Sequence, residues 1–138
     1  MQAETDYPRE CCGMILGPQA RPNIYSRLKP CRNAQDDYHA ADPENFPRTS
    51  KTAYFMDPAE LFQIQKEARS FNEVIRVIYH SHIDAPPDFS KEDERMAVSD
   101  GVPVYPGADY LISSIKAKKW DSMGLYRWSA AQKKFQKV

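Results

Sequence analysis

The sequence predicts one domain of the α/β or α+β class, in which a β-sheet is packed against helices. The chain has 138 residues, which suits a single domain with a substantial core. Its hydrophobic content of 41% is ordinary for a globular protein. Segments with strand character outnumber segments with helix character, and one strong helix signal separates the third predicted strand from the fourth. We therefore treat residues 1–138 as one domain.

The first half of the chain contains three predicted strands and one long loop. Residues 12–16 read as a strand that Gly17 and Pro18 end, and residues 24–28 as a second strand that pairs with it as a hairpin. Residues 33–50 are polar and contain prolines, which predicts a surface loop, either a functional edge or a passive insertion. Residues 52–56 are expected to form a short third strand.

A helix is predicted to start at Asp57. Asp57 suits the N-cap position, Pro58 the first helical position, and Glu60 the position three residues after the cap. Four apolar side chains then recur at helical spacing and predict a face buried in the core: Leu61, Ile64, Ala68 and Phe71.

The second half alternates strands with one more helix. Residues 74–79 are rich in β-branched side chains and predict a buried strand. A helix is expected from Ser90 to about Ser99, ended by Asp100 and Gly101. Residues 108–116 and 123–128 read as strands. The lysine-containing tail, residues 132–138, is expected to be a solvated face.

Charge and cysteine content exclude several classes of protein. Nineteen basic and 19 acidic residues cancel, so nothing favours binding to nucleic acid or to a membrane surface. No apolar run is long enough to span a bilayer, and the first residues lack the features of a signal peptide. The three cysteines, Cys11, Cys12 and Cys31, have no Cys-x-x-Cys spacing and are expected to pack as small hydrophobic groups. We expect a cytoplasmic protein.

Two of the three histidines lie at the end of the buried strand, separated by one residue. Alternate side chains of a strand point to the same side, so His80 and His82 are expected to face one point. Asp93, beyond a proline-containing loop, can complete a site with two His ligands and one Asp ligand. Taken alone, Ser90 and Asp93 are typical of a helix capping box, and His39 is typical of a solvent-exposed histidine. Two histidines, a serine and an aspartate at the offsets of His80, His82, Ser90 and Asp93 should arise together by accident on the order of a few times in ten thousand chains.

This spacing of His80, His82, Ser90 and Asp93 resembles the motif of the JAMM (MPN-plus) metalloprotease family. The family also has an upstream glutamate, and the segment from Tyr7 to Gly17, with Glu10, is similar to the Pro-x-Glu-x-Cys-Gly segment of its small bacterial members. The resemblance implies an α/β, cytidine-deaminase-like MPN fold, with a curved mixed β-sheet flanked by helices. In the family a full helix usually precedes the glutamate segment, whereas this chain has only a few residues there, so either the helix is abbreviated or the sequence is a shortened form. This departure leaves an edge that another subunit can cover, as in a homodimer.

The resemblance also implies a function and a role for each residue. His80, His82 and Asp93 are expected to bind Zn²⁺ and leave one position open for water. Glu10 is expected to act as general base and then general acid, and Ser90 to donate to the oxyanion. The implied activity is that of a peptidase or isopeptidase. Its implied substrate is a peptide or the C-terminal Gly-Gly tail of a ubiquitin-like sulfur-carrier protein. Ile83 replaces a proline that the family often has there, which changes the loop but removes no ligand.

Three alternatives belong to other classes. A non-catalytic MPN scaffold usually lacks a ligand or the glutamate, whereas this chain keeps all five positions. A cysteine hydrolase based on Cys11 or Cys12 needs a histidine beside them, which nothing in the sequence provides. A zinc deaminase needs His/Cys-x-Glu and Cys-x-x-Cys motifs, and both are absent.

Overall fold

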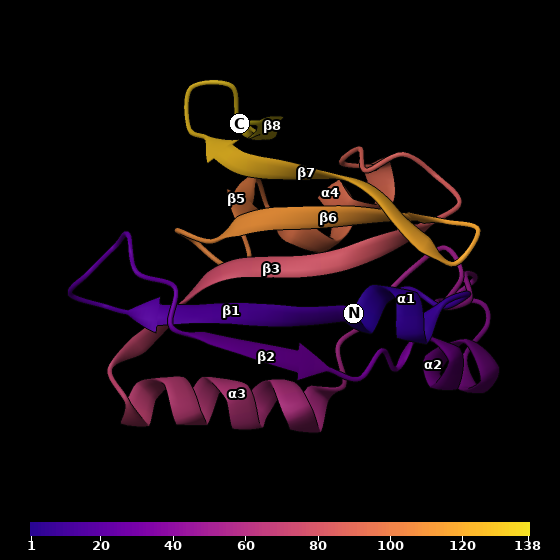
Figure 1. Cartoon of the computed structure of the whole chain (residues 1–138), viewed down its shortest axis with the longest axis horizontal. Coiled ribbons are helices and arrows are strands. Elements are labelled where there is room, and N and C mark those ends of the chain that lie inside the picture. The colour runs from indigo at the N-terminus through magenta and orange to yellow at the C-terminus, as the bar shows by residue number, and fades with distance from the viewer.

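Strand β3 (Glu73–Ile83) lies inside a six-stranded mixed sheet in the computed structural model, which describes residues 1–138. The strand order is β2-β1-β3-β6-β7-β8. Only β3 and β6 are parallel, and every other neighbouring pair is antiparallel. The other strands are β1 (Cys12–Pro18), β2 (Arg27–Cys31), β6 (Asp109–Lys116), β7 (Lys119–Ser129) and β8 (Lys134–Lys137). The sheet is twisted and curved (Figure 1), as predicted.

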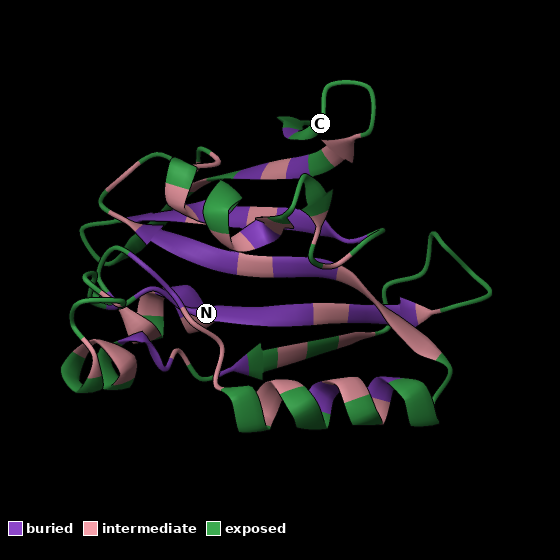
Figure 2. Ribbon diagram, turned by 180° about the vertical axis from the view of Figure 1, so that it is seen from behind, coloured by how far each residue is buried: buried purple, intermediate pink, exposed green.

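Helices lie on both faces of this sheet, but cover them unequally (Figures 1 and 2). Helices α3 (Pro58–Ser70) and α4 (Lys91–Ala97) pack on one face and bury the main core. The five-residue helix α1 (Gln2–Asp6) packs on the other face with a small second cluster. A five-residue helix therefore precedes Glu10. No helix is long and apolar enough to cross a membrane.

The main core follows the alternation of side chains in the central strands. One face of β1 contributes Met14 and Leu16, and the neighbouring strands contribute Ile78 and Ile112, all almost without exposed surface (Figure 2). Helix α3 adds Ile64 and Ala68, as its apolar spacing predicts. Because these side chains come from neighbouring strands, the position of each strand end is fixed by packing. The C-terminal end of β3, which carries both histidines, is part of this rigid frame.

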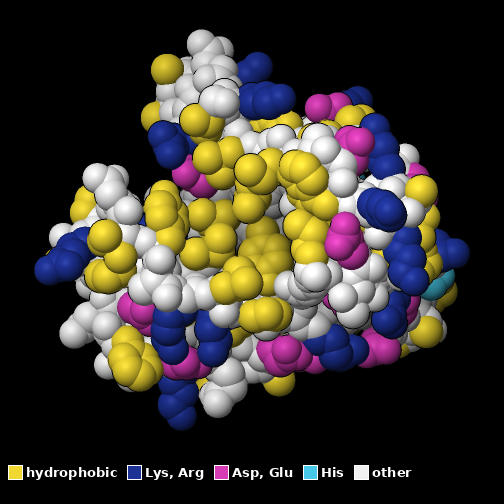
Figure 3. Space-filling model, in the orientation of Figure 1, with side chains coloured by type: hydrophobic (Ala, Val, Ile, Leu, Met, Phe, Trp, Pro, Cys, Tyr) yellow, Lys and Arg dark blue, Asp and Glu magenta, His cyan; other side chains and the backbone are white.

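The opposite face of the sheet is largely uncovered by helices. Figure 3 shows apolar side chains gathered over its middle. Leu28 is 60% exposed and lies opposite Ile15 in the ladder of β1 and β2, and Met123 of β7 is 58% exposed. An apolar surface of this kind is typical of a contact site. The homodimer stays a prediction, because the structure contains one chain.

Three predictions for the first half of the chain are wrong. The second strand is Arg27–Cys31 rather than 24–28, because its register with β1 places Cys31 opposite Cys12. Residues 52–56 make only an isolated bridge, between Met56 and Asn33, because they cross the sheet end instead of joining it. The predicted loop 33–50 contains helix α2 (Gln35–Ala41), which has no side-chain cap.

Boundaries in the second half also differ from the prediction. Helix α4 ends at Ala97, because the next residues form β4 (Val98–Ser99), which pairs with β5 (Val102–Pro103). Asp100 and Gly101 form the turn between them, with φ values of 50° and 78°, a hairpin turn that favours such residues. Strand β7 starts at Lys119, four residues earlier than expected. The tail is not wholly solvated, because β8 buries Phe135.

Candidate metal centre and active site

His80, His82 and Asp93 converge on one point, as their spacing predicts. The Nε2 atom of His80 lies 2.9 Å from one carboxylate oxygen of Asp93, and the Nε2 atom of His82 lies 3.1 Å from the other. The two Nε2 atoms are 3.3 Å apart. All three side chains are buried. They come from the end of β3 and from the first turn of α4, so the connection between these elements determines the site.

The connecting loop is held by hydrogen bonds to three successive carbonyl groups. Ser114 Oγ donates to Ala85 O at 2.6 Å, His82 Nδ1 donates to Pro86 O at 2.9 Å, and Tyr126 Oη donates to Pro87 O at 2.7 Å. Phe89 then packs against the rings of three core residues, Tyr110, Tyr126 and Phe135. These contacts and the two prolines stiffen the loop, although Ile83 stands where the family often has proline.

The hydrogen bond to Pro86 fixes the ring of His82. Because the Nδ1–H group of His82 donates a hydrogen bond to the Pro86 carbonyl, Nε2 is the nitrogen atom left to bind an ion. His80 is held differently: its Nδ1 is buried without a hydrogen-bond partner, and its ring stacks on Tyr54 with centroids 4.3 Å apart. One imidazole is therefore oriented by a hydrogen bond and the other by an aromatic contact.

The electrostatics of the three groups reflect burial and mutual contact. Burial lowers the pKa of His80, and its contact with Asp93 only partly opposes this. Burial would also lower the pKa of His82, but its hydrogen bonds to Asp93 and Pro86 outweigh that and raise it. For Asp93, burial is outweighed by the two histidines, which hold its pKa well below the ordinary range. Asp93 is therefore an anion, as a metal ligand must be.

Ser90 forms the N-cap of α4 in a capping box with Asp93. Its Oγ accepts a hydrogen bond from the Asp93 N–H at 3.0 Å, and its own N–H donates to Asp93 Oδ2 at 3.0 Å. The capping prediction is thus confirmed. The cap uses Oγ only as an acceptor, and the Ser90 hydroxyl donates to no protein group in the structure. Its proton remains available to another acceptor.

Glu10 lies at the edge of the same cluster. In the ladder of β1 and β3, Cys12 lies opposite His80, and Ser81 N donates to Cys11 O at 3.1 Å. Continuing this register places Glu10 opposite His82 and on the same face of the sheet. The side chain is 5% exposed. Burial raises its pKa to about 8, with His82 acting to lower it and Asp93 to raise it, which is consistent with their proximity.

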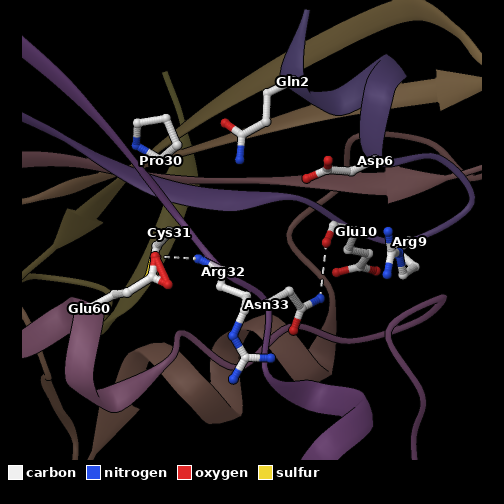
Figure 4. Close-up of a pocket in the computed structure, with 9 residues that line it drawn as sticks. All are labelled: Gln2, Asp6, Arg9, Glu10, Pro30, Cys31, Arg32, Asn33 and Glu60. Atoms are coloured by element: carbon white, nitrogen blue, oxygen red, sulfur yellow. Dashed lines mark hydrogen bonds between the residues drawn. The ribbon is translucent and has the colours of Figure 1, made fainter.

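The segment that holds Glu10 comes from the region predicted as a loop. The Glu10 N–H donates to Ser50 O at 2.7 Å, and Asn33 Nδ2 donates to Glu10 O at 3.0 Å (Figure 4). Ser50 is itself held by Asp36 of α2, which accepts from its N–H and its hydroxyl. Sequence reasoning missed these supporting residues and Tyr54, because none of them has a fixed-spacing partner.

A polar cavity of about 340 Å³ lies along the main chain at Glu10, between α1, the end of β2 and the start of α3. Its nine lining residues, all shown in Figure 4, are Gln2, Asp6, Arg9, Glu10, Pro30, Cys31, Arg32, Asn33 and Glu60. Charges of both signs line it, so it has no single-sign preference for a ligand. The histidine cluster does not line it.

The donor set fits a catalytic zinc ion. Two imidazoles and one carboxylate are ligands that zinc uses in catalytic sites, where three protein groups leave one position open. Tetrahedral ligands at about 2.0–2.2 Å from zinc lie roughly 3.3 Å apart. The three separations of 2.9, 3.1 and 3.3 Å between the donor atoms come close to this spacing. The trio can therefore hold a metal ion with small adjustments.

All three cysteines are free and buried, and Cys11 and Cys12, on which a cysteine hydrolase would depend, are poorly suited to nucleophilic attack. Burial raises the pKa of the Cys11 thiol to about 11, and contact with Cys31 together with burial raises that of Cys12 further. A thiol of raised pKa is not ionised at neutral pH and is inert. Cys11 packs beside α1, on the face opposite the histidines. The predicted packing role is confirmed. Cys12 does lie opposite His80 in the ladder of β1 and β3, but its fully buried thiol of raised pKa argues against the cysteine-hydrolase alternative.

Comparison with known proteins confirms the resemblance. Residues 1–126 match the family model described as prokaryotic homologs of the JAB domain. Proteins named CysO-cysteine peptidase, from Mycobacterium tuberculosis and Mycobacterium bovis, are 28% identical over 127 residues. The match covers 91% of this chain and 72% of each relative.

Two solved structures share the fold. A solution structure of a Desulfitobacterium hafniense protein has a TM-score of 0.68 and 24% identity, and it covers 99% of this chain and 80% of that one. A solution structure of a Salinibacter ruber protein has a TM-score of 0.62 and 21% identity, with the same coverage of 99% and 80%. Together with the family match, they agree with the MPN fold expected from the sequence.

Proposed function

Because the chain belongs to the prokaryotic JAB-domain family, we propose that it is a zinc-dependent metallopeptidase that hydrolyses an amide bond. The observation that supports the proposal is the pairing of Cys12 with His80 in the ladder of β1 and β3, because continuing this register by two residues sets the buried Glu10 opposite His82, near the contact of His80 with Asp93. A scaffold has no need for a buried carboxylate next to three convergent metal donors. The exposed apolar face of the sheet would suit a partner-binding scaffold, but it does not account for this buried carboxylate beside the three donors.

Each residue has a proposed task. His80, His82 and Asp93 hold the zinc ion, which, when bound, lowers the pKa of a water molecule and polarises a carbonyl group. Glu10 takes the proton of the attacking water as the C–O bond forms, and then returns it to the amine nitrogen as the C–N bond breaks. Ser90 donates its free hydroxyl proton to the developing oxyanion, while its Oγ continues to cap α4.

The protein surroundings support these tasks. The raised pKa of Glu10 reflects its buried position in the absence of a cation, and a neighbouring metal ion lowers the pKa of such a carboxylate. Glu10 then ionises and can act as a base at neutral pH. Burial of the trio also excludes water from the ligands, which strengthens their electrostatic interactions.

For the substrate, we propose the C-terminal Gly-Gly tail of a ubiquitin-like sulfur-carrier protein. The support is the name of the mycobacterial relatives, CysO-cysteine peptidase. We further propose that the protein works in a reducing compartment, the cytoplasm, which agrees with its three free thiols.

The experiment is metal analysis of the purified protein combined with a cleavage assay. The proposal expects about one zinc ion per chain and cleavage of fusions to a Gly-Gly-tailed carrier that a chelator abolishes and added zinc restores. The matched control is Asp93→Asn, in which both the zinc and the cleavage are lost. Cleavage that persists after complete removal of metal would falsify the proposal.

A further inference from the structure

The side-chain amide of Asn33 makes all four of its hydrogen bonds within the protein. Its Nδ2 group donates to Glu10 O at 3.0 Å and to Ala53 O at 3.2 Å. Its Oδ1 atom accepts from the Phe55 N–H and from the Gln35 N–H, both at 3.0 Å. An Asn side chain has two N–H donors and two acceptor lone pairs, so this group is fully satisfied. Two carbonyl groups on one side and two N–H groups on the other allow only one orientation of the amide.

One of these bonds holds the main chain of Glu10. The ladder of β1 and β3 begins at Cys12, two residues further along, so Glu10 lies just outside the regular pairing. Its N–H donates to Ser50 O at 2.7 Å, and its carbonyl accepts the bond from Asn33 Nδ2 (Figure 4). Ser50 and Asn33 therefore hold the peptide groups on the two sides of Glu10, and with them the point from which its carboxylate extends.

Two further bonds hold the main chain of Tyr54. Ala53 O and the Phe55 N–H belong to the peptide groups on the two sides of Tyr54, and the Asn33 amide pairs with both, as a neighbouring strand would. The ring of Tyr54 stacks on the imidazole of His80, with centroids 4.3 Å apart. Because His80 Nδ1 has no hydrogen-bond partner, this stacking is the contact that supports the ring. The same amide therefore acts on Glu10 directly and on His80 through Tyr54.

The path of the main chain near Asn33 does not depend on its side chain alone. Ala34 N donates to Phe55 O at 2.7 Å, and the main chain of Asn33 forms an isolated bridge with Met56. These main-chain contacts stay when the side chain at position 33 is changed. What the amide adds is the link from this segment to Glu10. We therefore expect a substitution of Asn33 to disturb the site more than the fold.

We propose that Asn33 is a positioning residue that holds the proposed base, Glu10, in place relative to the Tyr54 ring that supports His80. This rests on the proposed hydrolytic function of the site. Asn33 contacts neither the substrate nor the ion, and it acts through the two residues that its amide holds. Proton transfer requires the Glu10 carboxylate within hydrogen-bond reach of the attacking water. A displacement of about 1 Å can cost about a hundredfold in rate.

Asn33→Asp tests the proposal, because it keeps the size and an acceptor oxygen but removes both N–H donors. In the zinc-loaded protein, kcat for a Gly-Gly-tailed carrier fusion should fall about ten- to a hundredfold, while KM stays within about twofold. The affinity for zinc, measured by competition with a chelator, should fall about tenfold, because the support of His80 loosens. The control is Asn45→Asp, the same substitution in an exposed loop, where the amide donates to Asp42. It should change neither kcat nor the affinity for zinc.

The outcomes separate the role of Asn33 from the hydrolytic function. If the wild-type protein cleaves the fusion and Asn33→Asp keeps its kcat, the positioning role is wrong while the hydrolytic function stands. If the wild-type protein does not cleave it, the hydrolytic function fails, and zinc binding decides about Asn33: equal affinities in Asn33→Asp and the wild type would overturn its role. Should Asn33→Asp fail to fold, Asn33→Ser removes the amide without adding a charge, and it is compared with Asn45→Ser by the same criteria.

Discussion

The ring of Tyr54 lies against the imidazole of His80, with centroids 4.3 Å apart and planes 24° from parallel. This contact takes the place of the hydrogen bond that usually orients a metal-binding histidine, because His80 Nδ1 has no partner. Tyr54 belongs to the segment that also holds Glu10 through Ser50. One stretch of chain therefore supports a proposed metal ligand and the proposed base.

Replacing Tyr54 should weaken zinc binding without removing a ligand. Tyr54→Ala leaves the His80 ring free to turn, and loss of such a supporting group typically costs about 10- to 100-fold in metal affinity. Tyr54→Phe keeps the aromatic stack and should bind zinc as the wild type does. Competition with a fluorescent zinc chelator measures both. Equal affinities for the Ala and Phe variants would show that the stacking does not orient His80.

Replacing Asp93 should remove zinc but leave the fold. Asp93→Asn loses the anionic ligand, although the amide oxygen can still accept the hydrogen bond from the Ser90 N–H. We expect the zinc content to fall well below one ion per chain while circular dichroism stays unchanged. Glu94→Gln changes an exposed carboxylate on the same helix and serves as the control. Full zinc occupancy in Asp93→Asn would exclude this residue as a ligand.

Ser90 should contribute to stability and to rate through different atoms. Ser90→Asp keeps a good N-cap but has no hydroxyl donor, so its melting temperature should stay close to that of the wild type while kcat falls about a hundredfold or more. Ser90→Thr keeps both functions and should retain most of the activity. Undiminished kcat in Ser90→Asp would reduce Ser90 to a capping residue.

The stability of the metal-free protein should fall as the pH rises from about 4.5 to 8. Burial raises the pKa of Glu10 from 4.5 to about 8, so in this range the folded protein binds a proton that the unfolded chain has released. The loss is on the order of several kcal/mol at the upper end. Denaturant unfolding at a series of pH values measures it.

The Glu10→Gln variant and added zinc separate the contribution of Glu10 to this pH dependence from the contributions of other groups. His82 also has a raised pKa and contributes a loss of the same sign, whereas burial lowers the pKa of His80, which contributes a gain as the pH rises towards 6.5. The lowered pKa of Asp93 matters only in acid. Glu10→Gln should therefore make the pH dependence shallower, and zinc should do the same in the wild type, because a cation lowers the pKa of Glu10. Identical pH profiles for the wild type and Glu10→Gln would contradict a buried Glu10.

The sequence predicts the elements that carry strong local signals. The cap at Asp57 and the apolar spacing after it predict α3, and the β-branched run before His80 predicts β3. Helix α2 has no such signal: it lacks a capping side chain and is held by the contacts of Tyr38 with Phe46 and Phe55. Strand β2 contains Pro30, which argues against a strand until its position at the sheet edge is known.

In the site, too, residues with a local sequence signal can be predicted, and residues placed by long-range contacts cannot. The separation of His80, His82 and Asp93 along the chain predicts their convergence, because a strand end and a helix start have fixed directions. The position of Glu10 depends on the pairing of β1 with β3, and it was inferred from the family resemblance alone. Tyr54 could not be predicted, since its role comes from a segment that has no regular structure.

The most direct test of the account is the Glu10→Gln variant, assayed for zinc content and for hydrolysis in the same preparation. We predict about one zinc ion per chain, as in the wild type, and a rate lower by about a hundredfold or more, because the ligands remain and the proton carrier is lost. A variant that keeps its zinc and cleaves at the wild-type rate would contradict the account.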